Sequence, residues 1–559
     1  MFQSQQIKTT IFHKPYLLYL ASFIVMAFGQ NARAAGLGFI AYLMGTALFW
    51  GSQLESSCLK KIFKNSFFWF LFVQMIQLSW MATTAYHGIF ILLVYGVLCA
   101  LMAIQFALVT LFLLSRKTIS WMHGLIATSF WILLEYSRLF WFSGFTWNMT
   151  GLFFAHHTFP LQLASWIGVY GLSFWYMLMN IQALNALFLR KTKGSVASWL
   201  TLAFIPYLVG WGQVYYHDSK IKQSSKTNVV LVQTFLKPQE KIYSASQPES
   251  FISPYLQWHQ LFQAIKKVKD QKIDLIIMPE STLPYNAFLP IYRIQEIEKI
   301  WDINFLHDKK KSLPKPTDNG VPIKVSNAFL AQALANYYQA KVIMGFDDHD
   351  DLFTKSYNAA FLFDPEKSMP KRYIKQILVP LAEYFPFEWS KKIAYQFGIT
   401  GCFSAGPSSN AFGLNPPVGL SICYEETFSN IMRKTRLAGA ELFVNISNDI
   451  WFPNSKLDKQ HFEHARLRSV ENGTPAVRSC NGGTTVALDA LGRIVAQIKD
   501  NTKTDSLFVR LPRYHYHTFY EKVGDSFILI ISGFFVVLFM LRSYFTAQIH
   551  RYLGSSGIK

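Results

Sequence analysis

The sequence predicts two differently built parts: a multi-span α-helical membrane domain of about eight helices, and an α/β domain outside the membrane. Composition is the first indication, because the 559 residues are 51% hydrophobic and only 15% charged, whereas soluble domains carry about a quarter charged residues. Charge distribution is the second. Residues 1–216 hold 12 basic and 2 acidic side chains, and residues 217–559 hold 41 and 31. An entirely soluble, fibrous or disordered protein is therefore excluded.

Long apolar stretches supply the expected membrane spans. Most of them approach the ~20 residues that cross a bilayer core. They lie at about 15–30, 35–52, 66–85, 88–115, 119–141, 161–189, 197–216 and 524–541. We therefore expect an N-terminal membrane domain of seven helices at 1–216, a globular domain at 217–523, and a C-terminal transmembrane helix with its tail at 524–559.

Basic residues occupy alternate loops between these stretches. They are Lys60, Lys61, Lys64, Arg116, Lys117, Arg190, Lys191, Lys193, Arg542 and Arg551. Because cytoplasmic loops carry such residues, both termini are expected in the cytoplasm and residues 217–523 on the opposite side. A cleaved signal peptide ending at Ala32-Arg33-Ala34 is an alternative for the first stretch, and it leaves this orientation unchanged. Loop lysines that face anionic lipid account for the net charge of +20 without a nucleic-acid partner.

The cysteines do not indicate a metal site or a disulfide framework. The five of them form no CxxC pair, and the chain has no zinc signature and no Gly-rich phosphate loop, so no metal or cofactor is expected. Whether Cys402 and Cys480 pair stays open. Glu135 and Arg138 lie three residues apart within one expected span, which suits an internal ion pair that either fixes helix packing or takes part in chemistry.

From Asn228 onward, short β-rich runs alternate with helical patterns. Several runs are continuously apolar, which is typical of strands covered on both faces. The runs lie at 229–233, 274–280, 341–346, 358–363, 418–425, 441–447, 484–489, 493–498 and 506–511, and the clearest helical patterns at 250–269, 325–339 and 457–472. The alternation predicts a layered α/β domain with helices packed outside sheets.

Three reactive side chains stand at the ends of, or just after, these runs. Glu280 ends one run, Cys423 lies in another, and Lys375 follows the 358–363 run. Together they suit acyl transfer, since a thiol attacks a carbonyl, a carboxylate takes its proton, and an ammonium stabilises the oxyanion. A charged Lys375 beside Cys423 also favours the thiolate. Taken singly, each residue has an ordinary interpretation as core filling or a solvated surface charge.

The sequence motifs around these three residues resemble those of a known family. Pro279-Glu280, the stretch 373–380 (YIKQILVP) and 422–425 (ICYE) occur in the order Glu, Lys, Cys, which resembles the nitrilase (carbon–nitrogen hydrolase) superfamily. Further motifs that carry the resemblance lie at 378–386, 445–452, 460–468 and 478–483. One more, Gly144-Phe145-Thr146-Trp147, lies in the membrane half. Over almost its whole length the chain is similar to the bacterial apolipoprotein N-acyltransferases.

This resemblance implies a nitrilase-like αββα sandwich on the periplasmic side of a bacterial inner membrane. The family moves an acyl chain from a phospholipid, typically phosphatidylethanolamine, to a cysteine thioester. The α-amine of a diacylglyceryl-cysteine on an apolipoprotein then takes the chain, in the last step of lipoprotein maturation. The resemblance makes Cys423 the nucleophile, Glu280 the general base and Lys375 the oxyanion stabiliser. It makes Glu383, Tyr424 and Glu425 supporting or substrate residues; no cofactor is implied, and a monomer is expected.

The chain also departs from the family pattern. Ala382 stands where relatives have Gly, Thr146 where they have Pro, and Ile242-Tyr243 where they have a functional Trp. Two other functions stay open: a membrane-anchored amidase or nitrilase that passes its acyl group to water, and a non-catalytic scaffold that binds lipoproteins. The aromatic residues from Tyr384 to Trp389 and at Trp451-Phe452 are expected either to pack in the core or to form a rim where lipid chains enter.

Overall fold

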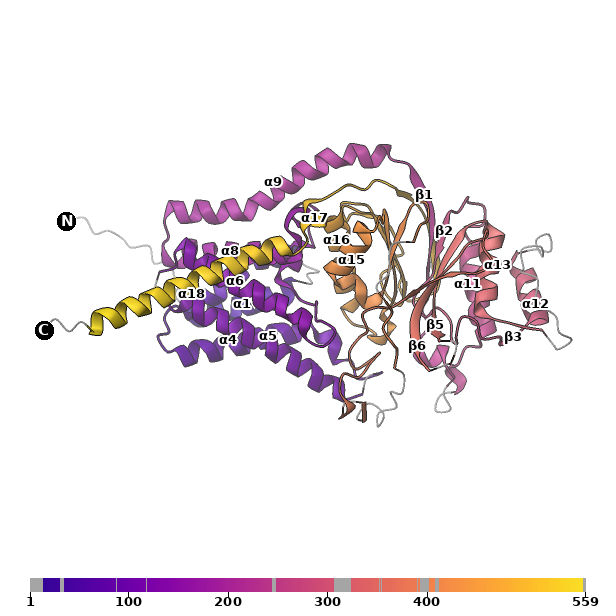
Figure 1. The fold of residues 1–559 in the computed structure, drawn as a ribbon, viewed down its shortest axis with the longest axis horizontal. Helices are drawn as coiled ribbons and strands as arrows, with labels where there is room; N and C mark the ends of the chain where they lie inside the picture. The colour runs from indigo at the N-terminus through magenta and orange to yellow at the C-terminus, as the bar shows by residue number, and fades with distance from the viewer. Residues whose placement is uncertain are drawn as a thin grey trace.

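A bundle of long helices and a two-sheet domain make up the molecule, side by side (Figure 1). The computed structural model describes residues 14–30, 35–86, 88–116, 118–243, 248–305, 323–350, 352, 354–389, 391–392, 402–407 and 412–555. Lys117 and the possible cleavage site at 32–34 lie outside these residues.

The bundle follows the apolar stretches. Its main helices are α1 (Pro15–Gly29), α2 (Ala35–Ile40), which continues through η1 (Ala41–Gly45) into α3 (Thr46–Gln53), α4 (Leu59–Gln77), α5 (Phe90–Leu114), α6 (Trp121–Ser137), α8 (Ala164–Leu184) with η5 (Asn185–Leu189), α9 (Lys193–Gln223) and α18 (Ser526–Ser555). Among the described residues, four helical stretches are long and apolar enough to cross a membrane: Phe90–Leu114, Ala164–Leu189, Lys193–Gln223 and Ser526–Thr546. The count of about eight spans stays a prediction, because α1 has 15 residues and α6 has 17, fewer than the ~20 of a full span.

Buried polar contacts tie the bundle together. Arg138 Nη1 lies 4.0 Å from Glu135 Oε1, and both side chains are buried. Arg138 Nε also donates to Gln105 Oε1 on α5 at 2.9 Å, while Glu135 Oε1 accepts from the amide of Thr150 at 2.8 Å. The predicted ion pair therefore joins α5, α6 and the segment at Thr150.

Among its described residues, the second domain contains two large sheets and a two-stranded one, in which β3 (Tyr292–Arg293) pairs with β4 (Lys324–Val325). The six-stranded sheet has the order β13 (Asp505–Pro512), β1 (Lys226–Gln233), β2 (Leu275–Ile277), β5 (Lys341–His349), β6 (Ser356–Phe363), β7 (Lys371–Ile374). The five-stranded sheet has the order β12 (Ile494–Gln497), β11 (Val486–Leu488), β10 (Ala476–Asn481), β9 (Leu442–Asn448), β8 (Val418–Ile422). The central pairs β1–β2, β2–β5, β8–β9 and β9–β10 are parallel.

Side-chain alternation on β1 shows how the layers stack. Val229 and Leu231 pack in the same core as Leu420 of β8 in the other sheet. Val230 and Val232 point the opposite way, as successive residues of a strand do, and pack with helices α11 (Pro254–Lys266), α12 (Ile294–Phe305) and α13 (Asn327–Tyr338). Helices α15 (Ser429–Leu437) and α16 (Leu457–Asn472) cover the five-stranded sheet. The αββα sandwich implied by the resemblance is confirmed.

The α15–α16 layer also packs against the bundle, so it lies between a sheet and the helical domain (Figure 1). Gln460 of α16 accepts a hydrogen bond from Trp80 Nε1 and donates one to the carbonyl of Gln77, both at 2.8 Å. Glu471 of α16 accepts from the amide of Val169 at 2.8 Å. Gly168 interrupts α8 just before this residue (φ 63°, ψ −176°). The expected single helix at 161–189 is therefore broken where the other domain supplies the missing acceptor.

Candidate active site

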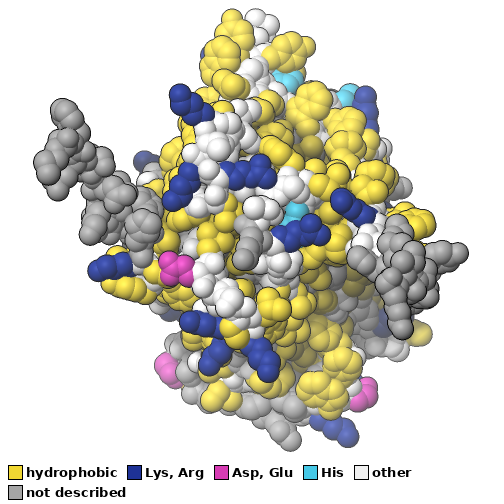
Figure 2. All heavy atoms as spheres, turned by 90° about the vertical axis from the view of Figure 1, so that its left-hand side faces the viewer, with side chains coloured by type: hydrophobic (Ala, Val, Ile, Leu, Met, Phe, Trp, Pro, Cys, Tyr) yellow, Lys and Arg dark blue, Asp and Glu magenta, His cyan; other side chains and the backbone are white. Residues whose placement is uncertain are grey.

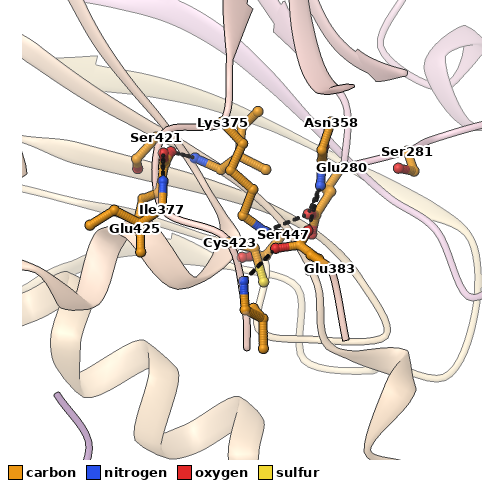
Figure 3. A network of polar contacts seen from close by, with 12 residues as sticks. Glu280, Ser281, Asn358, Lys375, Ile377, Glu383, Ser421, Cys423, Glu425 and Ser447 are labelled. Atoms are coloured by element: carbon orange, nitrogen blue, oxygen red, sulfur yellow. Dashed lines mark hydrogen bonds and ion pairs between the residues drawn. The ribbon is translucent and has the colours of Figure 1, made fainter. Parts of the chain in front are cut away.

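The three predicted reactive residues come together from both sheets. Glu280 follows β2 and Lys375 follows β7 in one sheet, while Cys423 follows β8 in the other. Cys423 adopts a left-handed conformation (φ 50°) at the turn from β8 into a 3-10 helix, Cys423–Thr427. This strained turn corrects the strand expected to run to 425, and such conformations cluster at functional sites. Figure 3 shows the Cys423 side chain beside Lys375 and Glu383.

Lys375 and Asn358 connect two carboxylates. Lys375 Nζ donates to Glu383 Oε1 at 2.8 Å and to Glu280 Oε1 at 3.2 Å. Asn358 Nδ2, at the start of β6, donates to Glu280 Oε1 at 2.7 Å and to Glu383 Oε1 at 3.0 Å (Figure 3). Lys375 is 1% exposed and Glu280 is 5% exposed, so these charges are held in a site largely closed to water. Sequence reasoning missed Asn358, although it was the polar residue opening an apolar run.

Burial decides the protonation states of the site. It raises the pKa of Glu280, with Glu383 adding to the effect while Lys375 and Asn358 oppose it. Burial also opposes the charge on Lys375, but Glu280 and Glu383 outweigh it and raise the pKa of Lys375 well above its usual range. For the Cys423 thiol, burial and Glu280 raise the pKa well above the usual range, and the opposing effect of Lys375 is smaller. Lys375 favours the thiolate, as expected, but burial and Glu280 outweigh it, so the thiol of the resting site keeps its proton until a base removes it.

A second group of polar residues holds the Cys423 turn. His461 Nε2 lies 3.1 Å from the carbonyl oxygen of Cys423, and His461 Nδ1 lies 3.0 Å from Asp449 Oδ1. Asn445 Nδ2 donates to the same carbonyl at 3.2 Å. Asn445, Asp449 and His461 belong to the sequence motifs at 445–452 and 460–468. Those motifs carried the family resemblance, but the sequence assigned no role to these three residues.

Glu425 connects the lysine loop to the cysteine strand. Its Oε1 accepts from the amides of Gln376 and Ile377 at 2.5 and 3.2 Å. Its Oε2 accepts from Tyr373 Oη and from the amide of Ile422, both at 2.7 Å. Glu425 thus binds both sides of the site while its own oxygens are fully engaged.

Tyr424 points toward the helical domain. Its hydroxyl donates to the carbonyl of Gly144 at 2.7 Å, and its ring stacks on Trp147 with 6.2 Å between centroids. Nearby aromatic residues make similar contacts: Phe387 packs on Phe142, and Phe452 packs on Trp80. The site therefore lies against the helical domain.

The remaining candidates are apart from this cluster. Cys402 is exposed, Cys480 is buried, and both are free thiols. Ile242 and Tyr243, the residues expected to replace a Trp of the relatives, are exposed. Within the described residues, no group of three or more His, Cys, Asp or Glu side chains is placed to hold a metal.

The fold and the cluster define the class: a carbon–nitrogen hydrolase domain joined to an apolar helical bundle. The sequence profile of the Carbon-nitrogen hydrolase family matches residues 245–513, and that of the Apolipoprotein N-acyltransferase N-terminal domain matches residues 20–182. The chain belongs to the apolipoprotein N-acyltransferase family.

Relatives that carry this family name align over most of their length. The apolipoprotein N-acyltransferase of Chlamydia caviae is 29% identical, with 92% of this chain and 95% of the relative covered. That of Chlamydia trachomatis is 28% identical, with 92% and 94% covered. The solved structure of Saccharomyces cerevisiae Nit3, a nitrilase-superfamily member, covers 54% of this chain and 95% of its own at 17% identity and a TM-score of 0.35.

Proposed function

We propose that the protein transfers a fatty acyl chain from a membrane phospholipid to the α-amine of the diacylglyceryl-cysteine of apolipoproteins. The donor is expected to be phosphatidylethanolamine, the intermediate a thioester on Cys423, and the enzyme a monomer. The observation that carries the proposal is the contact of Tyr424 with Gly144. Cys423 directly precedes Tyr424 in the chain, so the nucleophile lies close to the helical domain. Lipid substrates reach it there without leaving the bilayer.

In the first half-reaction, Glu280 takes the proton of the Cys423 thiol, and the sulfur attacks the ester carbonyl of the phospholipid. Lys375 stays protonated because of its raised pKa, so it stabilises the oxyanion of the tetrahedral intermediate. When the ester C–O bond breaks, Glu280 returns the proton to the departing lysophospholipid oxygen. Cys423 then carries the acyl chain.

The second half-reaction runs through the same residues. The free α-amine attacks the thioester carbonyl and loses a proton to Glu280. The C–S bond breaks, an amide forms, and the Cys423 sulfur regains the proton. Phe387, Trp389 and Trp451 are 45%, 56% and 39% exposed, and we infer that these aromatic side chains help to exclude water from the thioester.

The charge distribution supports an inner-membrane location with the two-sheet domain in the periplasm. Gln77 and Trp80 contact α16 at one end of the bundle, so the start of α4 lies at the opposite end. Figure 2 looks onto that end and shows many Lys and Arg side chains with few Asp or Glu. In the alternate loops that the sequence assigns to the cytoplasm, the exposed basic residues are Lys60, Lys61, Lys64, Arg116, Arg190, Lys191, Lys193 and Arg542.

The decisive experiment isolates the acyl-enzyme and follows its fate. Mass spectrometry of the protein with phospholipid should show an acyl adduct that Cys423→Ala abolishes and Cys58→Ala, the change of an exposed cysteine in the bundle, retains. Lys375→Ala should slow its formation by roughly 10²–10³. The adduct should persist in buffer and discharge rapidly onto a diacylglyceryl peptide, but not onto the same peptide with an acetylated amine. Decay to free fatty acid at one rate with or without peptide would make the protein a hydrolase.

A further inference from the structure

A cavity of about 620 Å³ lies away from the reactive cluster. It is bordered by the C-terminal part of α9, the start of α8, and the segment 514–519 that leads from β13 to α17 (Phe519–Val523). None of its lining residues belongs to the Glu280–Lys375–Cys423 site. Helix α9, which leads into β1, and the connection from β13 to α17 both border it.

The cavity lies at the level of the lipid headgroups. Counting the ~20 residues of a bilayer core from Lys193, the first residue of α9, places the end of the apolar layer near Gln213. Trp211 and Tyr215 are 62% and 76% exposed there, as expected of an aromatic belt at the membrane surface. Val209 and Gly212 line the membrane side of the cavity, and Lys220 lines the other.

The charges at the cavity favour a phosphate group. The lining residues include Lys220, His217 and His517 but no Asp or Glu. Lys220 Nζ donates to Tyr216 Oη at 2.7 Å and keeps two further protons for a ligand. His517 is paired with Glu521 at 3.0 Å, which leaves Lys220 as the main positive charge.

We propose that this cavity binds one anionic phospholipid of the bilayer, distinct from the acyl donor. Its phosphate lies at Lys220 and its chains run along Val209 and Gly212 into the apolar layer. The volume is within the ~300–1,000 Å³ typical of ligand pockets. A lipid bound there contacts α9 and the connection from β13 to α17, and so links the bilayer to the placement of the catalytic domain.

The test counts retained lipid by native mass spectrometry. The purified protein, stripped of lipid in detergent, is titrated with phosphatidylglycerol or with phosphatidylcholine. Gly212 lines the cavity, and a Cβ there meets no atom within 4 Å, so Gly212→Leu adds an apolar side chain at the cavity wall and improves helix propensity. A Cβ at Gly533 on α18, away from the cavity, also meets no atom within 4 Å, and Gly533→Leu is the matched control.

Wild type and Gly533→Leu should retain one phosphatidylglycerol that Gly212→Leu loses. Lys220→Glu should weaken phosphatidylglycerol binding at least tenfold and phosphatidylcholine binding less. Thioester formation on Cys423, followed in the same samples, should survive in Gly212→Leu. Equal phosphatidylglycerol binding by Gly212→Leu and wild type, or the joint loss of bound lipid and thioester formation, would overturn the proposal.

Discussion

At the residue scale, the reactive cluster places one ammonium between two carboxylates in a site closed to water. Lys375 contacts both Glu280 and Glu383, and the two carboxylates together keep it charged. Taking charged groups out of water is costly unless they are paired with opposite charges. Asn358 adds a second donor to the same two oxygens, so the cluster is held by four hydrogen bonds rather than by Coulomb attraction alone.

The raised pKa of Glu280 predicts the pH dependence of acylation. Glu280 accepts the thiol proton only when ionised, so the rate of thioester formation should rise with pH through a midpoint above the usual 4.5 of a glutamate. Lys375 should cause no loss of rate below its usual value of 10.5, because its own pKa is raised. Single-turnover rates of thioester formation, measured in buffered detergent micelles over a series of pH values, give this profile. A midpoint at or below 4.5 would contradict the role of Glu280 as base.

Asn358→Leu should move that midpoint to higher pH. The amide of Asn358 stabilises the ionised form of Glu280, and leucine keeps its approximate size without the donor. We expect the midpoint to rise and the rate at neutral pH to fall about tenfold, as for loss of one hydrogen bond to a charged group. Asn501→Leu, in a surface turn, is the control. A lowered rate with an unmoved midpoint would mean that Asn358 acts only through packing.

At the element scale, the 3-10 turn after β8 depends on contacts with four other segments. Glu425 binds the loop after β7, His461 of α16 and Asn445 of β9 bind the Cys423 carbonyl, and Tyr424 binds the helical domain. The left-handed Cys423 (φ 50°) costs energy by itself. These contacts compensate for it and keep the thiol in one place.

Glu425→Ala should therefore damage both stability and activity. It leaves the amides of Gln376, Ile377 and Ile422 without their acceptor, and each buried unsatisfied group costs about 1–3 kcal/mol. We expect the free energy of unfolding to fall by at least about 3 kcal/mol, and thioester formation to slow as Lys375 shifts. Glu425→Gln, which keeps one acceptor oxygen, should lose less of both. Thermal unfolding and single-turnover assays measure the two effects, and an unchanged rate in Glu425→Ala would show that the loop keeps its place without this contact.

At the scale of the whole molecule, the two domains share an interface rich in polar contacts, which fits a fixed mutual placement. Gln460, Glu471 and Tyr424 each bind backbone groups of the bundle. Because backbone groups in apolar surroundings must be paired, these contacts tie the orientation of the catalytic domain to the membrane. The orientation of the bundle therefore decides on which side the chemistry takes place.

Cysteine labelling tests that orientation. Ser368 lies in the exposed loop between β6 and β7. Ser555 is the last residue of α18 and lies beyond the apolar stretch Ser526–Thr546. In a background lacking the exposed thiols of Cys58 and Cys402, a membrane-impermeant maleimide added to spheroplasts should label Ser368→Cys and not Ser555→Cys. Lysed cells supply the control in which both are labelled. The reverse pattern in intact spheroplasts would place the two-sheet domain in the cytoplasm and exclude a periplasmic lipoprotein substrate.

Local pattern in the sequence determined the two-part build, the family, and the elements whose periodicity is complete. Helix α16 begins and ends at the expected residues 457–472, and β1 contains the expected apolar run. The reactive cysteine, lysine and glutamate were found because each lies in a sequence motif of the family, at the end of a strand or in the loop after one. These features depend on residues near one another in the chain, so sequence alone predicts them.

Tertiary structure decided what depends on partners far apart in the chain. Strand β10 was missed because its sequence, AVRSCN, is polar, yet the whole strand is buried, and its Arg478 pairs with Glu426 at 2.9 Å. The break in α8 exists where Glu471, 302 residues away, accepts the Val169 amide. The protonated thiol of Cys423 follows from burial, which no spacing of charges along the chain reveals. Desolvation and long-range pairing are properties of the packed molecule, and they set both the site's geometry and its proton balance.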